Sequence, residues 1–387
     1  MIRSSKVMGL ILMALAACTH PPTVQMTAQQ HVSEAQRIAG EDLIYLMPIC
    51  KPQPAVREAP SPAKDEALAK LIYQPAPSPG QAFDNLYYVG SAWVSAWVLK
   101  TNEGLILIDA LNNEQEATEL IIGGMRRLGL DPAQIRYILV THGHGDHYGG
   151  ARMLAQRYGS RVVTSEIDWR MMETQLEFDS KHWDRPPKRD IAVRDGDILT
   201  LGTTQVRIVI TPGHTLGTIT PVFDVLDQGQ RHTAMIWGGT SFNFGRDMTR
   251  LDGYIEQTQR MRQLVVTWGI DVPLSNHPGY DGTVAKLKAK SAAKDEIKNP
   301  FVSGQPVVDR AMRVLNACAR AQKARFTQGS DVLTQSSPLL MEGDARSRPN
   351  TLDHKYPYTR TARMESPGQN ALVFPNIALS LNGYHAH

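Results

Sequence analysis

The chain has 387 residues, of which 42% are hydrophobic and 20% are charged, an ordinary composition for a globular protein. Its formal net charge is +3, from 41 basic and 38 acidic residues, so no basic surplus would bind nucleic acid or an anionic membrane by charge alone. Its three cysteines exclude a Cys-rich zinc finger and a disulfide-dense miniprotein.

Residues 1–17 have the pattern of a secretory leader. Arg3 and Lys6 give a positive start, and Val7–Ala17 is an uncharged, mostly apolar run that is too short to cross a bilayer as a helix. The sequence Leu-Ala-Ala-Cys that ends at Cys18 resembles a bacterial lipobox. This resemblance implies a lipid on Cys18, which would be the protein's only membrane contact, and sorting to the outer membrane from the periplasm. The alternative is a cleaved leader in which Cys18 has no role.

Residues 18–82 are interpreted as an extended N-terminal arm that is not a domain of its own. One amphipathic run, Ala28–Met47, predicts a helix, and a Pro-rich connector follows it. A catalytic domain is expected over residues 83–326. The polar, Pro-containing residues 327–387 are predicted to be a poorly ordered tail.

Within residues 83–326, segments that fit strands alternate with segments that fit helices. The aromatic and β-branched run at 85–101 is broken at Gly90, which predicts a hairpin. The remaining expected strands are 104–108, 135–140, 196–210 and 220–238, and the expected helices are 114–128, 150–159, 252–268 and 307–324. This alternation predicts an α/β fold built of layers.

Two cysteines remain besides Cys18. Cys50 follows the expected N-terminal helix, and Cys318 lies in the last expected helix. An exported protein meets an oxidising environment, which favours a disulfide bond between them that would join the arm to the end of the domain. The alternative is a pair of buried free thiols.

A dense group of metal-ligand types follows the expected strand at 135–140. Residues 141–147 read Thr-His-Gly-His-Gly-Asp-His, and the glycines permit tight turns that let neighbouring side chains converge. Imidazoles and a carboxylate suit Zn²⁺. One loop cannot complete the ligands of one ion and also fill a second site, so further ligands must come from elsewhere. His214 and His277 fit, because each follows an apolar, strand-like stretch.

The order HxHxDH, then PGHT, then a late histidine resembles the metallo-β-lactamase superfamily over roughly Phe83–Phe326. The resemblance implies an αββα sandwich that holds two Zn²⁺ ions at one edge, between the sheets. It assigns three residues to the first zinc and three to the second, namely His142, His144 and His214, and then Asp146, His147 and His277.

The branch of the superfamily is indicated by what this chain has at other ligand positions. Glyoxalase II, ribonuclease Z and the lactonases carry a metal-bridging Asp at the position that aligns with Gly239, and the first subclass of class B β-lactamases uses a cysteine nearby. The second subclass has Asn in place of His142. The chain therefore most resembles class B, subclass 3, although that subclass usually carries Ser at the Gly239 position.

This resemblance implies a zinc-dependent hydrolase that opens the β-lactam ring of a small molecule with a zinc-bound hydroxide, oriented by Asp146. Asp109, at the end of an expected strand, is expected to hydrogen-bond to a metal ligand, with a purely structural role as the alternative. Substrate contacts are expected from Ser241, Asn243 and Tyr280, with packing as the alternative for Tyr280.

The segment Ser165–Asp190 leaves two roles open: a lid over an apolar substrate, or the core of a helix. Its large apolar residues are Trp169, Met171, Met172, Phe178 and Trp183. Trp93 and Trp97 alternate with small residues on an expected strand, which favours core packing. The remaining histidines lack a ligand context and are expected to lie on the surface or to pack.

Two other functions remain open. One is another exported hydrolase of the same fold, such as a lactonase, esterase or sulfatase; the missing bridging Asp argues against a lactonase. The other is a zinc-binding envelope lipoprotein without turnover. The complete ligand set argues against that second alternative, because a purely structural zinc site need not leave coordination open.

Overall fold

The computed structural model describes residues 25–57, 59, 61–292, 298–334 and 371–372. The expected leader and the lipidation of Cys18 fall outside these residues. Within the described ranges, no helix combines the length and the apolar character that a membrane span requires.

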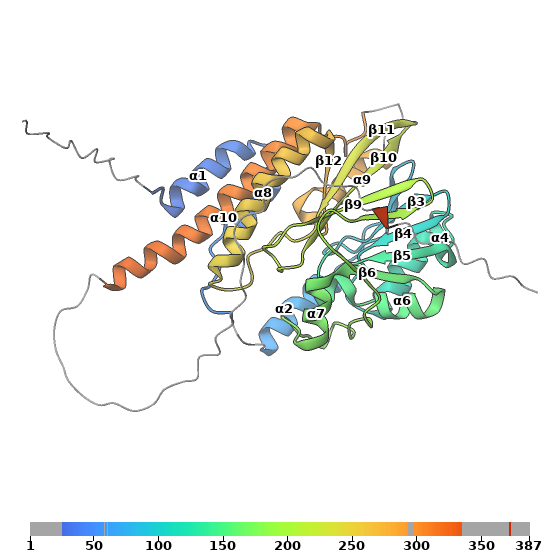
Figure 1. Ribbon diagram of the computed structural model, residues 1–387, viewed down its shortest axis with the longest axis horizontal. Helices are drawn as coiled ribbons and strands as arrows, with labels where there is room; N and C mark the ends of the chain where they lie inside the picture. The colour runs from blue at the N-terminus through green and yellow to red at the C-terminus, as the bar shows by residue number, and fades with distance from the viewer. Residues whose placement is uncertain (1–24, 58, 60, 293–297, 335–370, 373–387) are drawn as a thin grey trace, which may run out of the picture.

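Seven strands form the first sheet, in chain order (Figure 1). β1 to β4 run antiparallel, and β4 to β7 run parallel. The expected hairpin is confirmed, because β2 and β3 pair on either side of Gly90, where a Cβ would come within 2.6 Å of the Ala96 nitrogen. The strands are β1 Gly80–Phe83, β2 Leu86–Tyr88, β3 Trp97–Thr101, β4 Gly104–Ile108, β5 Ile135–Leu139, β6 Arg161–Ser165 and β7 Ile191–Val193.

The second sheet has the order β12-β11-β10-β9-β8-β13. β8 to β11 form an antiparallel meander, β12 pairs parallel with β11, and the two-residue β13 pairs parallel with β8. The strands are β8 Ile198–Leu201, β9 Thr204–Ile210, β10 Ile219–Asp227, β11 Gln230–Trp237, β12 Ile270–Ser275 and β13 Ala371–Leu372.

Helices cover the outer face of each sheet. The expected helix at 114–128 is present as three joined segments, of which the middle one is π-helical. The helical segments are α1 Ala28–Ala39, η1 Ile44–Cys50, α2 Pro62–Ile72, α3 Glu114–Glu116, η2 Ala117–Ile122, α4 Gly123–Arg127, η3 Pro132–Gln134, α5 Gly145–Tyr148, α6 Ala151–Tyr158, α7 Glu166–Thr174, α8 Met248–Trp268, η4 Pro278–Tyr280, α9 Thr283–Ala292 and α10 Gln305–Thr334.

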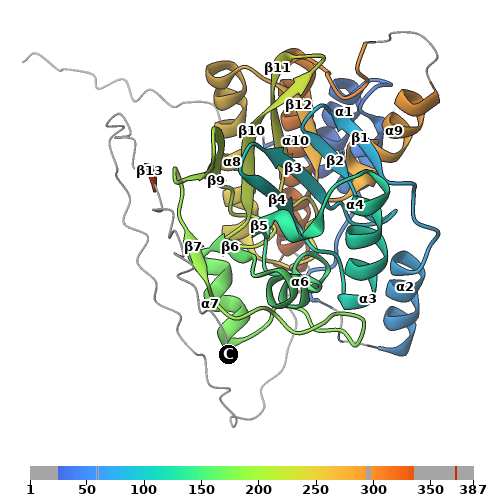
Figure 2. The same ribbon diagram turned by 90° about the vertical axis from the view of Figure 1, so that its right-hand side faces the viewer.

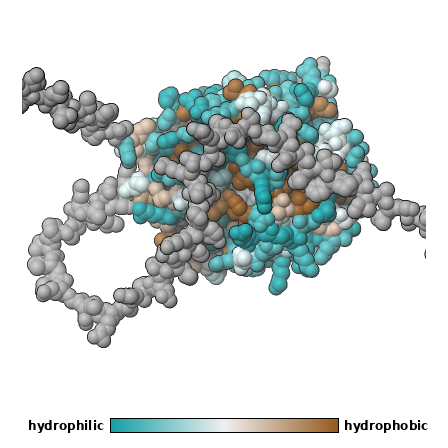
Figure 3. Space-filling model, viewed as in Figure 1, coloured by the Kyte–Doolittle hydropathy of each residue, from teal (hydrophilic) through white to brown (hydrophobic). Residues whose placement is uncertain are grey.

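Three apolar clusters define the layers. One fills the space between the two sheets, and a second lies between the first sheet and helices such as α4 and α6, which Figure 2 shows on one side of that sheet. The third lies between the second sheet and α1, α8 and α10, which run side by side in Figure 1. The expected αββα sandwich is thus confirmed. Apolar surface gathers toward the middle of the face in Figure 3, with hydrophilic side chains around it.

The N-terminal arm differs from the prediction in two places. The amphipathic run does not continue as one helix to Met47, because α1 ends at Gly40, whose φ of 60° suits glycine, and the short 3-10 segment η1 follows. The Pro-rich connector contains a second helix, α2. Ser61 caps α2 by accepting from the Lys64 N–H, and Pro62 occupies its first position.

The arm packs on the last helix instead of extending from the domain. Cys50 and Cys318 form a disulfide bond that joins η1 to α10, and the Arg325 guanidinium donates to the Cys50 carbonyl at 2.9 Å. α10 continues to Thr334, so residues 327–334, which were expected to belong to the tail, are helical. The rest of the expected tail lies outside the described residues, apart from β13.

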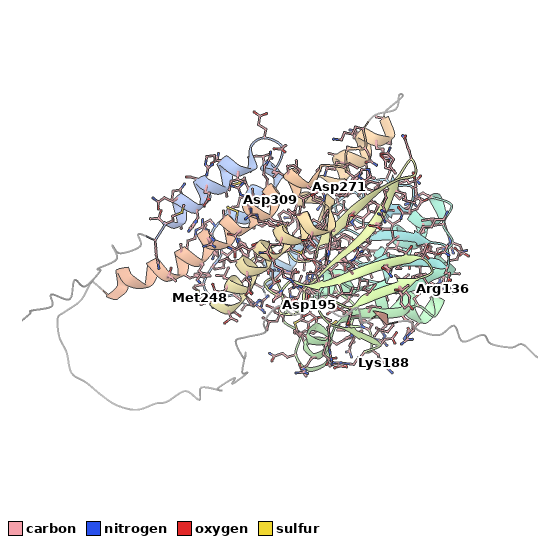
Figure 4. The ribbon with its side chains drawn as sticks, turned by 45° about the horizontal axis from the view of Figure 1, so that its top comes forward. Arg136, Lys188, Asp195, Met248, Asp271 and Asp309 are labelled. Atoms are coloured by element: carbon pink, nitrogen blue, oxygen red, sulfur yellow. A yellow bond between two sulfur atoms is a disulfide. The ribbon has the colours of Figure 1, made fainter. Side chains whose placement is uncertain are left out.

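Ion pairs connect helix α8 to neighbouring segments. Arg260 contacts Asp195 at 2.8 Å, and Arg262 contacts Asp309 of α10 at 2.6 Å. Figure 4 labels both aspartates together with Met248, the first residue of α8. Since these pairs are partly exposed, each contributes at most about 1 kcal/mol, and the apolar cluster beneath α8 provides more of its stability.

Candidate metal centre

The candidate ligands lie on loops that follow strand ends. The motif loop at 141–147 comes after β5, His214 comes four residues after β9, and His277 comes two residues after β12. Asp109 directly follows β4. These loops meet at one edge of the sandwich, so residues 135 positions apart in sequence become neighbours, as the hydrogen bond from Asn276 Nδ2 to Thr141 Oγ1 shows.

Four of the five candidate histidines are held in one tautomer. In each, Nδ1 donates to an oxygen that can only accept, so the lone pair of the neutral ring lies on Nε2. These Nδ1 distances are 2.8 Å from His142 to the Gly238 carbonyl, 2.8 Å from His147 to Asp109 Oδ2, 2.8 Å from His214 to the Ser241 carbonyl and 2.7 Å from His277 to the Trp93 carbonyl.

His144 has the opposite orientation. Its Nε2 contacts Glu177 Oε2 at 3.2 Å, and its Nδ1 lies 3.1 Å from His214 Nε2. Tetrahedral zinc with ligands at about 2.0–2.1 Å separates neighbouring nitrogens by about 3.3 Å, so this spacing fits two ligands of one ion. The Nε2 atom of His142 is buried without a hydrogen-bond partner among the described residues, and the Nε2 atom of His147 lies 3.3 Å from Asp146 Oδ2, another candidate donor. The donor set therefore fits zinc.

Two groups of donor atoms lie close enough to hold an ion. In each group the atoms lie within 4.8 Å of one another. His277 Nε2 lies 3.7 Å from Asp146 Oδ2, beside the second group, so the structure brings together all six side chains that the sequence assigned to zinc. The groups are His142, His144 and His214, and His142, Asp146 and His147.

Burial and charge set the protonation of these groups. Burial, reinforced by neighbouring imidazoles, holds the pKa of His142 and of His214 well below the usual value and lowers that of His277 to about 4. Burial also opposes a charged His147, but Asp146 and Asp109 outweigh it and raise its pKa to about 10. For Asp146, burial is outweighed by His147, and the pKa lies below its usual value.

Asp109 holds the motif loop through hydrogen bonds to Thr141 and His147. One oxygen accepts from the Thr141 N–H at 2.7 Å, and the other accepts from the Thr141 hydroxyl at 2.9 Å and from His147 Nδ1 at 2.8 Å. The residue is fully buried and has a φ of 62°, a region in which Asp and Asn are the commonest residues after glycine. Asp109 thus orients a candidate ligand.

Two further carboxylates, Asp168 and Glu177, support the site, and neither was predicted from the sequence. Asp168 is buried and accepts from the Gly143 N–H at 2.8 Å and from the Thr215 hydroxyl at 2.8 Å, which joins the two histidine loops. Its only sequence signal is its place three residues after Ser165, the N-cap of α7. Burial raises the pKa of Asp168.

Glu177 is the second missed carboxylate, and no local pattern points to it. It lies 33 residues from His144, whose Nε2 it contacts, and Arg250 Nη1 binds its other oxygen at 2.5 Å. Burial disfavours the charged carboxylate, but His144 and Arg250 outweigh it and lower its pKa to about 2. Arg57 of the arm also contacts Glu177, at 3.3 Å.

Gly239, which follows β11, offers no side chain to a metal ion. A Cβ there would lie 2.5 Å from the Cβ of His214, closer than two non-bonded carbon atoms can approach. At Gly238 a Cβ would lie 1.8 Å from the Ile219 carbonyl oxygen. With His214 in this position, neither Ser nor Asp can stand at Gly239 without displacing a candidate ligand.

A cavity of about 510 Å³ opens over the histidines. Its wall includes all three residues expected to contact substrate, Ser241, Asn243 and Tyr280. In the segment Ser165–Asp190, Trp169 and Met172 pack in the core, as one of the two expected roles requires, whereas Phe178 and Trp183 line the cavity. Met171 lies against Gly143 of the motif loop. Trp97 is buried between the sheets, as expected, but Trp93 faces the cavity.

Comparison with protein families identifies the central part of the chain. Residues 94–225 match the family described as the Metallo-beta-lactamase superfamily. The match includes the motif loop and His214.

Solved structures are similar over more of the chain. BJP-1 of Bradyrhizobium japonicum, described as a subclass B3 metallo-beta-lactamase, is 28% identical with a TM-score of 0.56, over 70% of this chain and 99% of BJP-1. MIM-1 of Novosphingobium pentaromativorans is 22% identical with a TM-score of 0.53, over 69% of this chain and 94% of its own. FEZ-1 of Legionella gormanii is 22% identical with a TM-score of 0.51, over 68% and 97%. The last two show the fold alone.

Curated relatives have a different name. A hydroxyacylglutathione hydrolase of Rhodopseudomonas palustris strain BisA53 is 36% identical over 108 residues, which is 28% of this chain and 34% of the relative. The enzyme of that name from Nitrobacter hamburgensis is 33% identical over 130 residues, 33% of this chain and 45% of the relative. The chain therefore spans less than half the length of these relatives.

Proposed function

Since the chain carries a domain of the metallo-beta-lactamase superfamily, we propose that it is a zinc-dependent hydrolase that opens β-lactam rings. The observation that carries the proposal is the second donor group. It combines Asp146 and His147 with the nearby His277, while Gly239 excludes the bridging carboxylate that lactonases and glyoxalase II use. The structural similarity to BJP-1, which extends over 99% of the BJP-1 chain, supports the same proposal.

Two ions would be held by the six candidate ligands. His142, His144 and His214 would bind one ion. Asp146, His147 and His277 would bind the other. When bound, zinc polarises a carbonyl oxygen and lowers the pKa of water so that hydroxide forms near neutral pH.

The protein's own groups position the reactants. Asp146 faces the cavity as an ionised carboxylate and accepts a hydrogen bond from the attacking water, which orients its lone pair. Ser241 and Asn243, on the cavity wall, offer an O–H and an N–H to the substrate's carboxylate. Trp93 and Trp183 exclude bulk water, which strengthens every polar contact inside the cavity.

A thioesterase acting on hydroxyacylglutathione is the second candidate, because the curated relatives have that name. These relatives match only part of the chain, and the absence of a carboxylate at Gly239 disfavours it. A thioesterase would need another group for the role of the bridging Asp.

The proposal is tested by hydrolysis of nitrocefin and meropenem by the zinc-loaded protein. Turnover that disappears with EDTA and in Asp146→Ala, but persists in the surface control Asp252→Ala, would support a β-lactamase. Zinc bound near two per chain without β-lactam turnover would refute it.

We also propose that the protein is exported and anchored by a lipid on Cys18. The support is the leader pattern and the lipobox-like sequence. Expression in a Gram-negative host with labelled palmitate should label the protein, and Cys18→Ala should not be labelled. Label on the variant, or none on the wild type, would refute the anchor.

A further inference from the structure

The N-terminal arm forms one wall of the active-site cavity. Tyr45 and Pro48 of η1, and Leu68 and Leu71 of α2, line the same cavity as the candidate ligand His144. These residues precede the superfamily match, which covers residues 94–225.

Helix α2 presents its apolar side chains in two directions. Ile72 is 2% exposed and packs inward, whereas Leu68 and Leu71 line the cavity, and Leu71 remains 43% exposed. Leu68 and Leu71 are three positions apart and therefore share a face of the helix. Because Leu68 and Leu71 lie on a cavity wall, part of their apolar surface stays in contact with water until an apolar ligand group covers it.

Aromatic side chains complete this part of the cavity. Trp93, Phe178 and Trp183 line it, and Trp183 is fixed by its Nε1–H bond to Asn112 Oδ1 at 2.8 Å and by its contact with Gly145, where a Cβ would lie 2.5 Å away. Phe178 stacks beneath the guanidinium of Arg57 at 4.1 Å. The aromatic part of the wall is therefore preformed.

Helix α2 is held to the segment that supplies these aromatic residues. Tyr73, at the end of α2, contacts His182 Nδ1 at 3.4 Å, and Lys181 pairs with Asp65 at 3.5 Å. Because His182 directly precedes Trp183, these two contacts bring α2 next to the segment that carries Trp183. The space of about 510 Å³ suits a ligand of drug size.

We propose that α2 forms a subsite for an apolar, aromatic side chain of the substrate, remote from the bond that is cleaved. The substrate class is thus β-lactams that carry an aryl acyl group, a conclusion that rests on the proposed function. The leucine face of α2 and the aromatic residues of the same cavity would enclose the aryl ring. Binding would remove apolar surface of both the ring and the wall from water and replace it with contacts between them.

Two penicillins with the same nucleus test the subsite. Benzylpenicillin carries a phenylacetyl group where 6-aminopenicillanic acid has a bare amino group. The ratio of their kcat/KM values should fall about tenfold in Leu68→Ala/Leu71→Ala, mostly through benzylpenicillin, since removing part of an apolar wall weakens discrimination by this order. The control Val266→Ala/Val284→Ala trims two exposed apolar side chains away from the cavity and should keep the wild-type ratio.

Binding of the ring-opened penicillins separates this proposal from the proposed function. These acids are not turned over, and their binding to zinc-loaded protein can be followed through the fluorescence of Trp93 and Trp183. If neither penicillin is hydrolysed but the benzyl acid binds more tightly, and the α2 variant loses that preference, the proposed function fails and the subsite stands. If wild type, α2 variant and control show the same ratio, the subsite is refuted.

Discussion

Replacing Asp109 by Asn would separate the role of its negative charge from its shape. Asn is isosteric and tolerates the φ of 62° found at this position, so the backbone should keep its conformation. The amide oxygen can still accept from the Thr141 N–H. The amide NH₂ would then face His147 Nδ1–H and the Thr141 hydroxyl. In its present tautomer the imidazole can only donate through Nδ1, so it cannot accept a hydrogen bond from the amide.

Two outcomes for His147 both weaken metal binding. If the ring keeps its proton on Nδ1, two donors face each other, and a bond to a charged group worth about 1.5–3 kcal/mol is lost. If the proton moves to Nε2, the ring loses the lone pair that points into the site. Either way we expect zinc affinity at the second donor group to fall by about 10–100-fold, the usual effect of removing a partner of a metal-binding histidine.

The assay is a zinc titration against a chromophoric chelator, with a melting curve to check the fold. Asp271→Asn is the matched control, because Asp271 accepts from His232 Nδ1 at 2.6 Å and from the Thr233 N–H at 3.0 Å in the same manner, away from the candidate ligands. Asp109→Asn should weaken one of two zinc ions and Asp271→Asn neither. Two tightly bound zinc ions in Asp109→Asn would contradict this role of the Asp109 charge.

Three further predictions follow from the same contacts. Gly239→Ala should weaken zinc at the first donor group, because the added Cβ displaces His214; titration showing unchanged affinity would contradict this. The zinc affinity of the second donor group should rise about tenfold per pH unit from pH 6 to 8, because His147, with a pKa of about 10, must lose a proton before it binds zinc. A zinc affinity that does not change with pH would contradict this prediction. Reducing the Cys50–Cys318 bond, which closes a loop of 268 positions, should lower the free energy of unfolding by about 3–5 kcal/mol in denaturant titrations; no change on adding dithiothreitol would contradict it.

The layers and the ligands could be predicted because their signals are local. Apolar runs marked β3 to β5 and the stretches that form β8 to β11, although β6 and β7 were not predicted. The motif loop carries four candidate donors, three histidines and one aspartate, within residues 142–147. Asp109 could be found because a carboxylate at the end of a buried strand lies where the active-site loops meet. His214 and His277 were recognisable by the same placement after strands.

The carboxylates that support the ligands could not be predicted, because their partners are distant in sequence. Nothing near Glu177 marks it as the contact of His144, since the two meet only after α7 and the following loop pack over the motif. Asp168 is likewise defined by the Gly143 and Thr215 groups that it joins.

Helix α2 was missed for a different reason. Prolines on both sides indicated an extended connector, although Ser61 and Pro62 together form a helix start signal. Its function was not readable either, because Leu68 and Leu71 show only an ordinary apolar spacing. Their place on the cavity wall depends on how the arm is held by α10 and by the segment around His182.

The measurement that tests the central claim most directly is a competition between the two candidate substrates. Zinc-loaded protein is mixed with equal concentrations of benzylpenicillin and a hydroxyacylglutathione thioester, and the loss of each is followed in one sample, which gives the ratio of their kcat/KM values. We expect the β-lactam to be consumed first, because Gly239 offers no bridging carboxylate and the cavity has an apolar wall. Consumption of the thioester with the β-lactam left intact would contradict it.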